Sequence, residues 1–367
     1  MLEFTLLVCV LTGCWQPKLW TSLYQHIIYK SYAFFIVSSL YTFSISQFMT
    51  IVLNVENSDE FIDSLYMMLT VLVAGYKQVY MWVDRKNIMV MINVFKEKPF
   101  AAVDAHEFEI QKKFEKMVQN NTLRYLILVI TAVISTILMS VFTAYASGNL
   151  TYKAWMPFNY SHPVLYICVY CYQLVGMASS GIVNVACESV ICGLLLHICC
   201  QLEILEHRLS KMTEDERTLG DCVHHHNLIF EYAYTVNNMF AKIIGLQFAV
   251  SMLVICSNLY RIAMTMDFVI IISLIMYTGA ILTQIFIYCW FGNEVKVKSL
   301  QFASKIYDIK WPALSNSCKK GLIIIMKRAT IPIEFSSAYI VTMNLESFVA
   351  LLKMSYSVFN LLRQAQE

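Results

Sequence analysis

The chain has 367 residues, of which 58% are hydrophobic and 14% charged, and its formal net charge is +2. This composition excludes an ordinary soluble domain and indicates a polytopic helical membrane protein. Without a basic tract, the near-neutral charge gives no support for nucleic-acid binding, and no nucleic-acid partner is expected.

Residues 1–26 precede the first long apolar run and are expected to form a cytoplasmic N-terminal segment. Residues 3–14 resemble the core of a signal peptide, but no basic segment precedes them and Glu3 has the wrong charge. A polar stretch with Pro17 follows where a cleavage site would need small residues. We therefore expect a short interfacial or re-entrant helix that stays in the mature protein.

Six apolar segments follow, each able to cross a hydrocarbon core of about 30 Å as a helix that rises about 1.5 Å per residue. They cover residues 27–55, 61–83, 125–147, 163–201, 243–260 and 268–293. The fourth is too long for one crossing and should project beyond the membrane. The fifth should continue an amphipathic helix that starts near Cys222. Together they form the expected transmembrane region, residues 27–293.

The cysteines, histidines and sequence motifs of the chain give no indication of a metal site or of catalysis. Most of the twelve cysteines lie inside apolar runs, where cysteine packs as a small hydrophobic residue, so we expect no disulfide framework. Three adjacent histidines, His224, His225 and His226, point in different directions on a helix and should form a solvated cytoplasmic face. The sequence shows no phosphate loop, zinc motif or nucleophile elbow, so neither metal, cofactor nor enzymatic activity is expected.

The distribution of Lys and Arg predicts the orientation, because cytoplasmic loops are enriched in these residues. The connections after the second, fourth and sixth segments hold eight, three and eight of the 27 Lys and Arg residues. Lys18 and Lys30 add to the same side, whereas the opposite side has only Lys153, Arg261 and Arg363. The N-terminus is therefore expected in the cytoplasm and the C-terminus outside the cell.

Glycosylation sequons agree with this orientation. Asn149 and Asn159 each begin a sequon in the connection after the third segment, which should lie outside the cell. Asn120 also begins a sequon but lies on the basic side, where it should stay unmodified. We expect a glycoprotein modified at Asn149 and Asn159.

The last 33 residues, 335–367, are expected to form one spanning helix with a polar stripe. Steps of seven, four, three and four residues place its polar side chains on one face: Glu346, Lys353, Ser357, Asn360 and Gln364. A polar face at membrane depth must meet water, protein or another charge. The stripe therefore either lines an aqueous pore or packs on neighbouring helices, and the residues alone leave both open.

The orientation also excludes familiar classes. G-protein-coupled receptors have seven helices with the N-terminus outside, the inverse of the arrangement expected here. Secondary transporters tend to have repeated halves and broken helices, and this sequence has no internal repeat.

Several motifs resemble the insect odorant receptor family. LESFVALLKMSYSVFNLL at residues 345–362 is similar to the last helix of these receptors. YCWFGNE at residues 288–294 and KRATIP at residues 327–332 are similar to the segments that precede that helix. The spacing of further residues also fits: Ser299, Ala303, Tyr307 and Trp311. GCWQP at residues 13–17 resembles a pattern near the N-terminus of these receptors.

The resemblance implies an all-α fold of seven transmembrane helices and an odorant-gated, non-selective cation channel. Members assemble as tetramers around a central pore, most often as heterotetramers with a shared co-receptor. Their place is the plasma membrane of olfactory sensory neuron dendrites. This chain lacks the co-receptor's long insertion between helices 4 and 5, so the resemblance implies a tuning subunit.

The resemblance also assigns roles to the C-terminal residues. Residues 294–334 become a cytoplasmic anchor between subunits and the first part of helix 7, and residues 335–367 become the pore-lining helix. Leu361 takes the position of the hydrophobic gate, with Asn360 and Gln364 as polar neighbours. A ring of apolar side chains can close a pore by dewetting.

The implied odorant pocket lies between the outer halves of helices 2, 3, 4 and 6. Its candidate residues are Met68, Leu69, Leu72, Ile137, Val141, Tyr145, Tyr166, Tyr170, Gln173, Met276 and Tyr277. None is charged, and an ionic ligand would lack a compensating partner. We therefore expect a small neutral odorant that makes one hydrogen bond to a tyrosine or to Gln173.

Two alternatives to an odorant-gated channel stay open. One is a gustatory-type receptor channel of the same fold, which would detect contact chemicals. The other is a metabotropic receptor of inverted topology.

Overall fold

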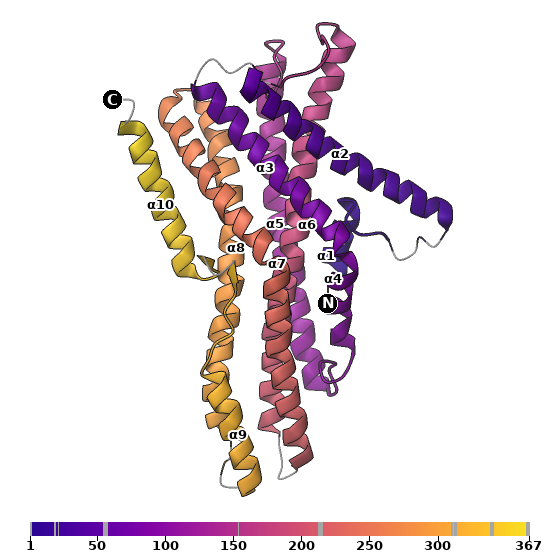
Figure 1. Cartoon of the computed structure of the whole chain (residues 1–367), viewed down its shortest axis with the longest axis vertical. Coiled ribbons are helices and arrows are strands. Elements are labelled where there is room, and N and C mark those ends of the chain that lie inside the picture. The colour runs from indigo at the N-terminus through magenta and orange to yellow at the C-terminus, as the bar shows by residue number, and fades with distance from the viewer. Residues whose placement is uncertain are drawn as a thin grey trace.

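The chain folds into a bundle of long helices with one short hairpin, as the computed structural model in Figure 1 shows. The structure describes residues 2–17, 20, 22–53, 58–152, 154–211, 216–309, 311, 314–337 and 341–364. The helices are α1 (Glu3–Leu11), α2 (Leu23–Leu53), α3 (Ser58–Val83), α4 (Arg85–Asn93), η1 (Val94–Lys96), α5 (Ala105–Ser140), η2 (Val141–Tyr145), α6 (Pro163–Ser210), α7 (Glu216–Met264), α8 (Phe268–Tyr307), α9 (Asn316–Ala329) and α10 (Leu345–Gln364). Strands β1 (Ser336–Ser337) and β2 (Val341–Thr342) pair antiparallel between α9 and α10.

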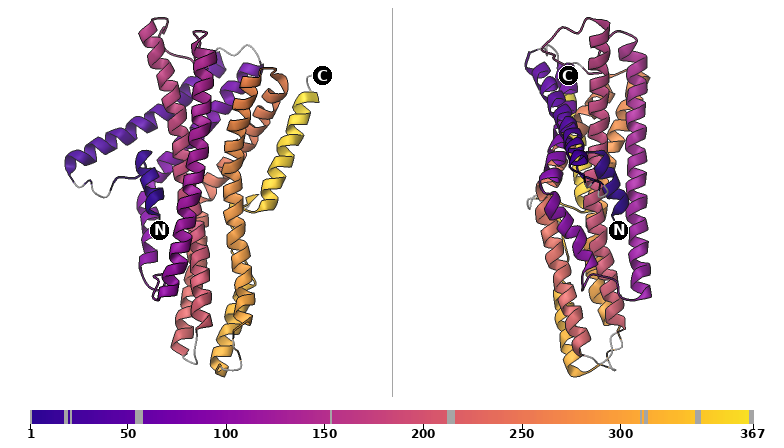
Figure 2. Two further views of the ribbon diagram at one scale, coloured as in Figure 1. Left: turned by 180° about the vertical axis from the view of Figure 1, so that it is seen from behind. Right: turned by 90° about the vertical axis from the view of Figure 1, so that its right-hand side faces the viewer.

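Helix α6 forms the centre of the bundle. It packs against α1, α2, α3, α5, α7 and α8. In the most apolar stretch of α6, 89% of the residues are buried, whereas in the corresponding stretch of α5 with η2 only 17% are buried. Helices α2 and α3 cross the bundle obliquely, whereas α10 stands at its edge (Figures 1 and 2). We call the end that carries the C-terminus in Figure 1 the upper end and the end that carries α9 the lower end.

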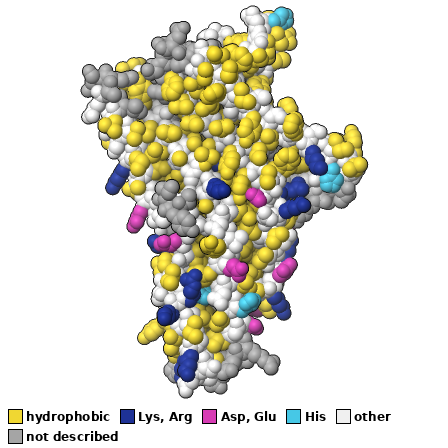
Figure 3. Space-filling view, viewed as in Figure 1, with side chains coloured by type: hydrophobic (Ala, Val, Ile, Leu, Met, Phe, Trp, Pro, Cys, Tyr) yellow, Lys and Arg dark blue, Asp and Glu magenta, His cyan; other side chains and the backbone are white. Residues whose placement is uncertain are grey.

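The charged and apolar surfaces separate along the bundle. In the face that Figure 3 shows, hydrophobic side chains cover most of the upper half, while Lys, Arg, Asp and Glu gather in the lower half. Five helices of the described chain are long and apolar enough to cross a membrane: α2, α5 with η2, α6, α7 and α8. The expected helices are present, and α5, α7 and α8 extend into the charged lower half as long continuous helices.

Local signals set several helix starts. The Asp104 carboxylate accepts a hydrogen bond from the backbone N–H of Glu107 at 2.8 Å and caps α5. Asp267 caps α8 in the same way through Val269, and Ser315 caps α9 through Cys318. These caps satisfy backbone N–H groups that have no partner within the helix.

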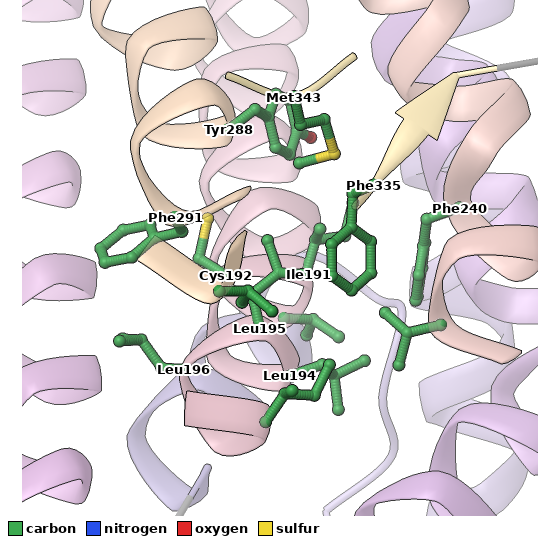
Figure 4. Packing of buried hydrophobic residues seen from close by; sticks show 14 of the residues in the cluster. Ile191, Cys192, Leu194, Leu195, Leu196, Phe240, Tyr288, Phe291, Phe335 and Met343 are labelled. Atoms are coloured by element: carbon green, nitrogen blue, oxygen red, sulfur yellow. The ribbon is translucent and has the colours of Figure 1, made fainter. Parts of the chain in front are cut away.

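The core at mid-height joins the central helix to the C-terminal part of the chain. Leu194 and Leu195 of α6 are fully buried and lie near Phe240 of α7 and Tyr288 of α8 (Figure 4). Phe335 and Met343, which flank the hairpin, complete this cluster. The hairpin therefore anchors the start of α10 to the bundle.

The C-terminal helix is shorter than expected. The sequence predicted one helix from residue 335, but residues 336–337 and 341–342 form strands and α10 starts at Leu345. The reason is a cap: the Asn344 side chain accepts a hydrogen bond from the backbone N–H of Ser347 at 2.8 Å. A side chain on Gly292 of α8 would overlap the Met343 carbonyl, so glycine is needed where the hairpin lies on α8.

The histidine prediction was wrong for two of three residues. His224 is exposed, but His225 and His226 are buried against neighbouring elements. Arg208 Nη1 lies 3.2 Å from His225 Nδ1, and His225 Nε2 lies 2.9 Å from Gln201 Oε1. Burial, and after it the Arg208 charge, lower the pKa of His225 to about 3. No cluster of three or more potential metal ligands occurs among the described residues, and the cysteines among them form no disulfide.

Candidate ligand cavity and polar C-terminal helix

The upper half of the bundle contains a cavity of about 270 Å³, which we call the upper cavity. Residues of α2, α3, α5, η2, α7 and α8 line it, together with the connection before α6. Hydroxyl groups are prominent in its lining: Ser64, Tyr66, Thr136, Thr143, Ser273 and Tyr277. A concave site with a few placed polar groups is the usual form of a small-molecule site.

An inner cavity of about 80 Å³ lies between α3, α5, α6 and α8. It shares Thr136 and Tyr277 with the upper cavity, so the two cavities adjoin. Much of its remaining wall is apolar and includes Met67, Val129 and Met177. One elongated molecule can therefore occupy both.

Tyr277 marks the boundary between the cavities and is held in place from α3. Its hydroxyl lies 2.8 Å from Thr70 Oγ1, and its ring centroid lies 5.8 Å from that of Tyr66. Thr70 donates its own hydroxyl hydrogen to the Tyr66 carbonyl at 2.8 Å. Tyr277 is therefore the donor in its bond with Thr70.

A charged residue lines the upper cavity, contrary to the expected uncharged pocket. Arg261, at the end of α7, was assigned to an outer connection by the sequence, but its side chain turns into the cavity wall. Its Nη1 donates to the Tyr66 hydroxyl at 3.3 Å, and its guanidinium lies 5.9 Å from the Tyr66 ring centroid. The charge is thus engaged by an aromatic hydroxyl and ring of the same wall.

Of the eleven predicted pocket residues, only Tyr277 lines either cavity. Leu72, Val141 and Tyr145 are exposed on the bundle surface. Met68, Leu69, Ile137, Tyr166 and Met276 are half-buried without reaching the cavities.

Three of the predicted tyrosines do come together at the upper end. The rings of Tyr145, Tyr166 and Tyr170 lie 5.2 to 6.2 Å apart. Gln173 holds the preceding connection, because its amide donates to the Tyr152 carbonyl and accepts from the Tyr152 N–H. These residues hold the upper end of the bundle together. The Gln173 amide already bonds to the Tyr152 backbone through both its oxygen and its nitrogen.

The residues that were missed are close neighbours of the predicted ones. Met67, Thr136 and Leu274 line the cavities, whereas Met68, Ile137 and Met276 do not. A helix turns about 100° per residue, so an error of one position moves a side chain off the cavity face. Gln47 and Thr151 also line the upper cavity, and no sequence pattern pointed to them.

A buried polar cluster lies beside the inner cavity, and we call it the mid-bundle cluster. The Lys77 ammonium donates to Glu188 Oε1 at 2.8 Å, to Asn184 Oδ1 at 2.8 Å and to Gln247 Oε1 at 2.5 Å. Gln284 donates to Glu188 Oε1 and accepts from Gln247. Lys77 is 0% exposed and Glu188 1%, so each charge depends on the other for compensation. The cluster joins α3, α6, α7 and α8.

Helix α10 presents its polar stripe away from the rest of the chain. Glu346, Lys353, Ser357, Leu361 and Gln364 are exposed, and Asn360 is half-buried. The opposite face packs on α7 and α8, where Leu351 and Ser355 are buried and Cys256 lies 3.5 Å from the Ser355 carbonyl. Within the described part of the chain, the stripe therefore does not pack on neighbouring helices. The side chain of Arg363 lies outside the described residues, as does Lys153.

The two sequons expected to be modified lie in the connection between η2 and α6 at the upper end. Asn149 and Asn159 are both exposed there. Asn120 lies within α5 instead, one turn or less from the buried Thr122 of its own sequon. Exposed loop positions are the ones that a glycosylating enzyme can reach.

Comparisons with known proteins bear on this arrangement. The 7tm odorant receptor family matches residues 57–356 of the chain. Odorant receptor 46a, isoform A, of Drosophila melanogaster is 29% identical over 234 residues, which cover 59% of this chain and 60% of that protein. Odorant receptor Or2 of Anopheles gambiae is 32% identical over 146 residues, covering 40% and 39%. The aligned part of this chain thus spans 60% or less of the length of these two relatives.

A solved structure shares the fold. The olfactory receptor OR5 of Machilis hrabei in complex with eugenol superposes with a TM-score of 0.86 and 17% sequence identity. The superposition covers 99% of this chain and 97% of that one. A second structure of the same receptor superposes with a TM-score of 0.84. The all-helical polytopic fold is thereby established.

Proposed function

The chain belongs to the insect odorant receptor family, and from this premise we propose that it is the tuning subunit of an odorant-gated, non-selective cation channel. The observation that carries the proposal is the upper cavity of about 270 Å³ with its adjoining inner cavity, in a member of this family. Membership of this family also identifies the protein as a receptor channel and not an enzyme.

The proposed ligand is a small neutral volatile molecule that lies between α3, α5, α6 and α8. The inner cavity has no ionised side chain in its lining, and the Arg261 charge in the upper cavity is engaged by Tyr66. Burying an ionic ligand there would therefore require compensation that these walls do not offer. Eugenol in the Machilis hrabei receptor supports a ligand of this class.

The proposed pore is lined by α10. Its outward-facing stripe gains a partner when four subunits, including the shared co-receptor, place their α10 helices around one axis. In that arrangement Leu361 forms the gate, beside Asn360, Gln364 and Ser357, with Lys353 and Glu346 further along. Leu361 is 65% exposed in the single chain, which is unfavourable for a leucine facing water and fits a constriction that closes by dewetting.

The lower end is proposed to lie in the cytoplasm. Residues 1–26, the lower ends of α6, α7 and α8, and residues 294–334 would form the cytoplasmic part and the anchor between subunits. Residues 27–293 would hold the six other transmembrane helices in the lipid of the plasma membrane. The gathering of Lys and Arg at the lower end supports this orientation, and Asn149 and Asn159 would then carry glycans outside the cell.

Recording from cells that express the chain with the co-receptor tests the function. An odorant panel should evoke a cation current that persists when G-protein signalling is blocked. A current abolished by that block would indicate a metabotropic receptor, and responses limited to sugars or bitter solutes would indicate the gustatory-type alternative.

A further inference from the structure

The inner cavity has two polar groups on its α6 wall that no protein group satisfies. Ser180 and Asn184 lie one helical turn apart, are 3% and 8% exposed, and both line this cavity. Among the described residues, neither Ser180 Oγ nor the Asn184 NH₂ group has a hydrogen-bond partner. Buried polar groups are nearly always hydrogen-bonded, so this pair marks a place for a further molecule.

Lys77 determines which end of the Asn184 amide faces the cavity. An ammonium group can only donate, and it takes Asn184 Oδ1 at 2.8 Å. The amide is planar, so its NH₂ group points away from Lys77, and Asn184 itself lines the inner cavity. Glu188 and Gln247 hold Lys77 from its other sides. Lys77 is thus a positioning residue that makes Asn184 a donor towards the cavity.

Several other polar groups of this wall are engaged within the protein. Thr136 donates to the Ala132 carbonyl at 3.0 Å, and Tyr277 donates to Thr70. Gln284 donates one N–H to Glu188 and accepts from Gln247, both within the mid-bundle cluster. On the α6 side of the wall, the donors still available are those of Ser180 and Asn184.

We propose that the inner cavity is a subsite for a hydrogen-bond acceptor of the ligand, a carbonyl, ether or hydroxyl oxygen, which binds Ser180 and Asn184. This inference rests on the proposed odorant receptor function. The inner cavity of about 80 Å³ admits a small polar end group, since a water molecule takes about 30 Å³ in the liquid. The rest of the ligand then lies in the adjoining upper cavity. The preferred ligand is a neutral, oxygen-bearing molecule, oriented with its oxygen inward.

Dose–response currents from cells that coexpress the co-receptor test this subsite. The probes are methyl ketones and primary alcohols of medium chain length, each paired with the alkene of the same carbon skeleton. We expect the wild type to prefer the oxygen-bearing member of a pair. Asn184→Leu, which keeps the branching and the number of side-chain heavy atoms and removes the donor, should raise the half-maximal concentration of that member about tenfold and change that of the alkene less than twofold. Ser180→Ala should give a smaller shift, about threefold, with the same selectivity.

Ser189→Ala is the matched control, because it removes a buried α6 hydroxyl that lines neither the upper nor the inner cavity. It should leave the oxygen preference unchanged. Suppose that Asn184→Leu and Ser180→Ala reach the surface and shift the half-maximal concentrations of both members of a pair equally, or shift neither. Resident water alone would then satisfy these donors, and the proposed subsite would be overturned. A wild type that prefers the alkenes would overturn it as well. If Asn184→Leu does not reach the surface, Ser180→Ala decides the question by the same criterion. A wild type silent to all odorants would instead refute the proposed receptor function.

Discussion

Polar side chains occur on largely apolar helices in two regions of the chain, and they point in opposite directions. In the mid-bundle cluster, Lys77 and Glu188 face each other across α3 and α6 and are almost wholly buried. On α10, Lys353 and Glu346 face outward and are exposed. The first region is surrounded by helices of its own chain, and the second has neighbours on one side only.

The difference shows which functions one subunit can complete alone. The mid-bundle cluster and the two cavities are formed by residues of this one chain, so the proposed ligand would bind without a contribution from a second chain. In the part of the chain that the structure describes, no other element covers the α10 stripe, and a charged face towards lipid is costly. In the proposed assembly, the stripe faces water that other subunits enclose. Substitutions should therefore act on stability in the first region and on permeation in the second.

The largest effect on stability is expected from Lys77→Met. Removing the cation leaves the Glu188 carboxylate buried without compensation, and breaking one side of a buried pair costs about 3–5 kcal/mol. We expect little folded protein at the cell surface and a strongly lowered apparent Tm in detergent, measured by size-exclusion chromatography of a fluorescent fusion after heating.

The double variant Lys77→Met, Glu188→Gln separates charge from packing. It removes both charges and should recover most of the surface expression, because an amide is far less costly to bury than an unpaired carboxylate. A double variant as unstable as the single one would show that the cluster stabilises the bundle by packing and not by charge compensation.

The two regions were predictable from the sequence to different degrees. The α10 stripe was predicted well, because the step between Glu346, Lys353 and Ser357 is a property of one helix. The mid-bundle cluster was not, since Lys77 finds its partners on helices more than a hundred residues away. Hydropathy placed the long helices but could not fix their rotation, so it could not show which side chains line the two cavities. The start of α10 was missed because the Asn344 cap is a short, local signal inside an apolar run.

A third polar cluster lies at the charged lower end of the bundle and is less completely buried than the mid-bundle cluster. Arg208 donates to Glu107 through both Nε and Nη2, at 2.8 and 2.9 Å, and to the carbonyls of Pro99 and Ala101. It is 18% exposed, so water can partly replace lost contacts. Arg208→Lys keeps the charge but loses the planar fork, and should cost about 2 kcal/mol, less than Lys77→Met. Lys211→Ala, at an exposed pair with Asp104, is the control and should lower the apparent Tm little.

The same lower cluster predicts a smaller effect of pH. Burial, and then Arg208, lower the pKa of His225 to about 3, and burial lowers that of His226 to about 4. The unfolded chain binds these protons near pH 6.5, so stability is complete above that pH and falls as the pH drops below it. From pH 7.5 to 5.5 each histidine should remove about 1 kcal/mol of the free energy of unfolding.

The check is the apparent Tm of the detergent-solubilised receptor at both pH values. His225→Gln should flatten the dependence, because Gln keeps a polar side chain there and cannot take up a proton. The Glu107 carboxyl does not interfere in this range: burial alone would raise its pKa, but Arg208 and the Val103 N–H lower it overall. An equally steep dependence in a double His225→Gln, His226→Gln variant would place the titrating groups elsewhere.

The smallest effect on stability, and the most specific one on function, is expected on α10. Leu361 is exposed in the single chain, so Leu361→Ser should change the apparent Tm little. If four such positions close the pore by dewetting, a serine there should wet the closed channel and raise the ligand-independent current. The co-receptor's own ring would reduce this increase in a heteromer.

Asn360→Ala and Gln364→Ala should instead change conductance or ion preference. Phe359→Leu, at nearly the same depth on the half-buried side of α10, should change neither. Unchanged basal current and conductance in surface-expressed Leu361, Asn360 and Gln364 variants would mean that α10 faces something other than the pore, and the contrast between the two polar regions would need another explanation.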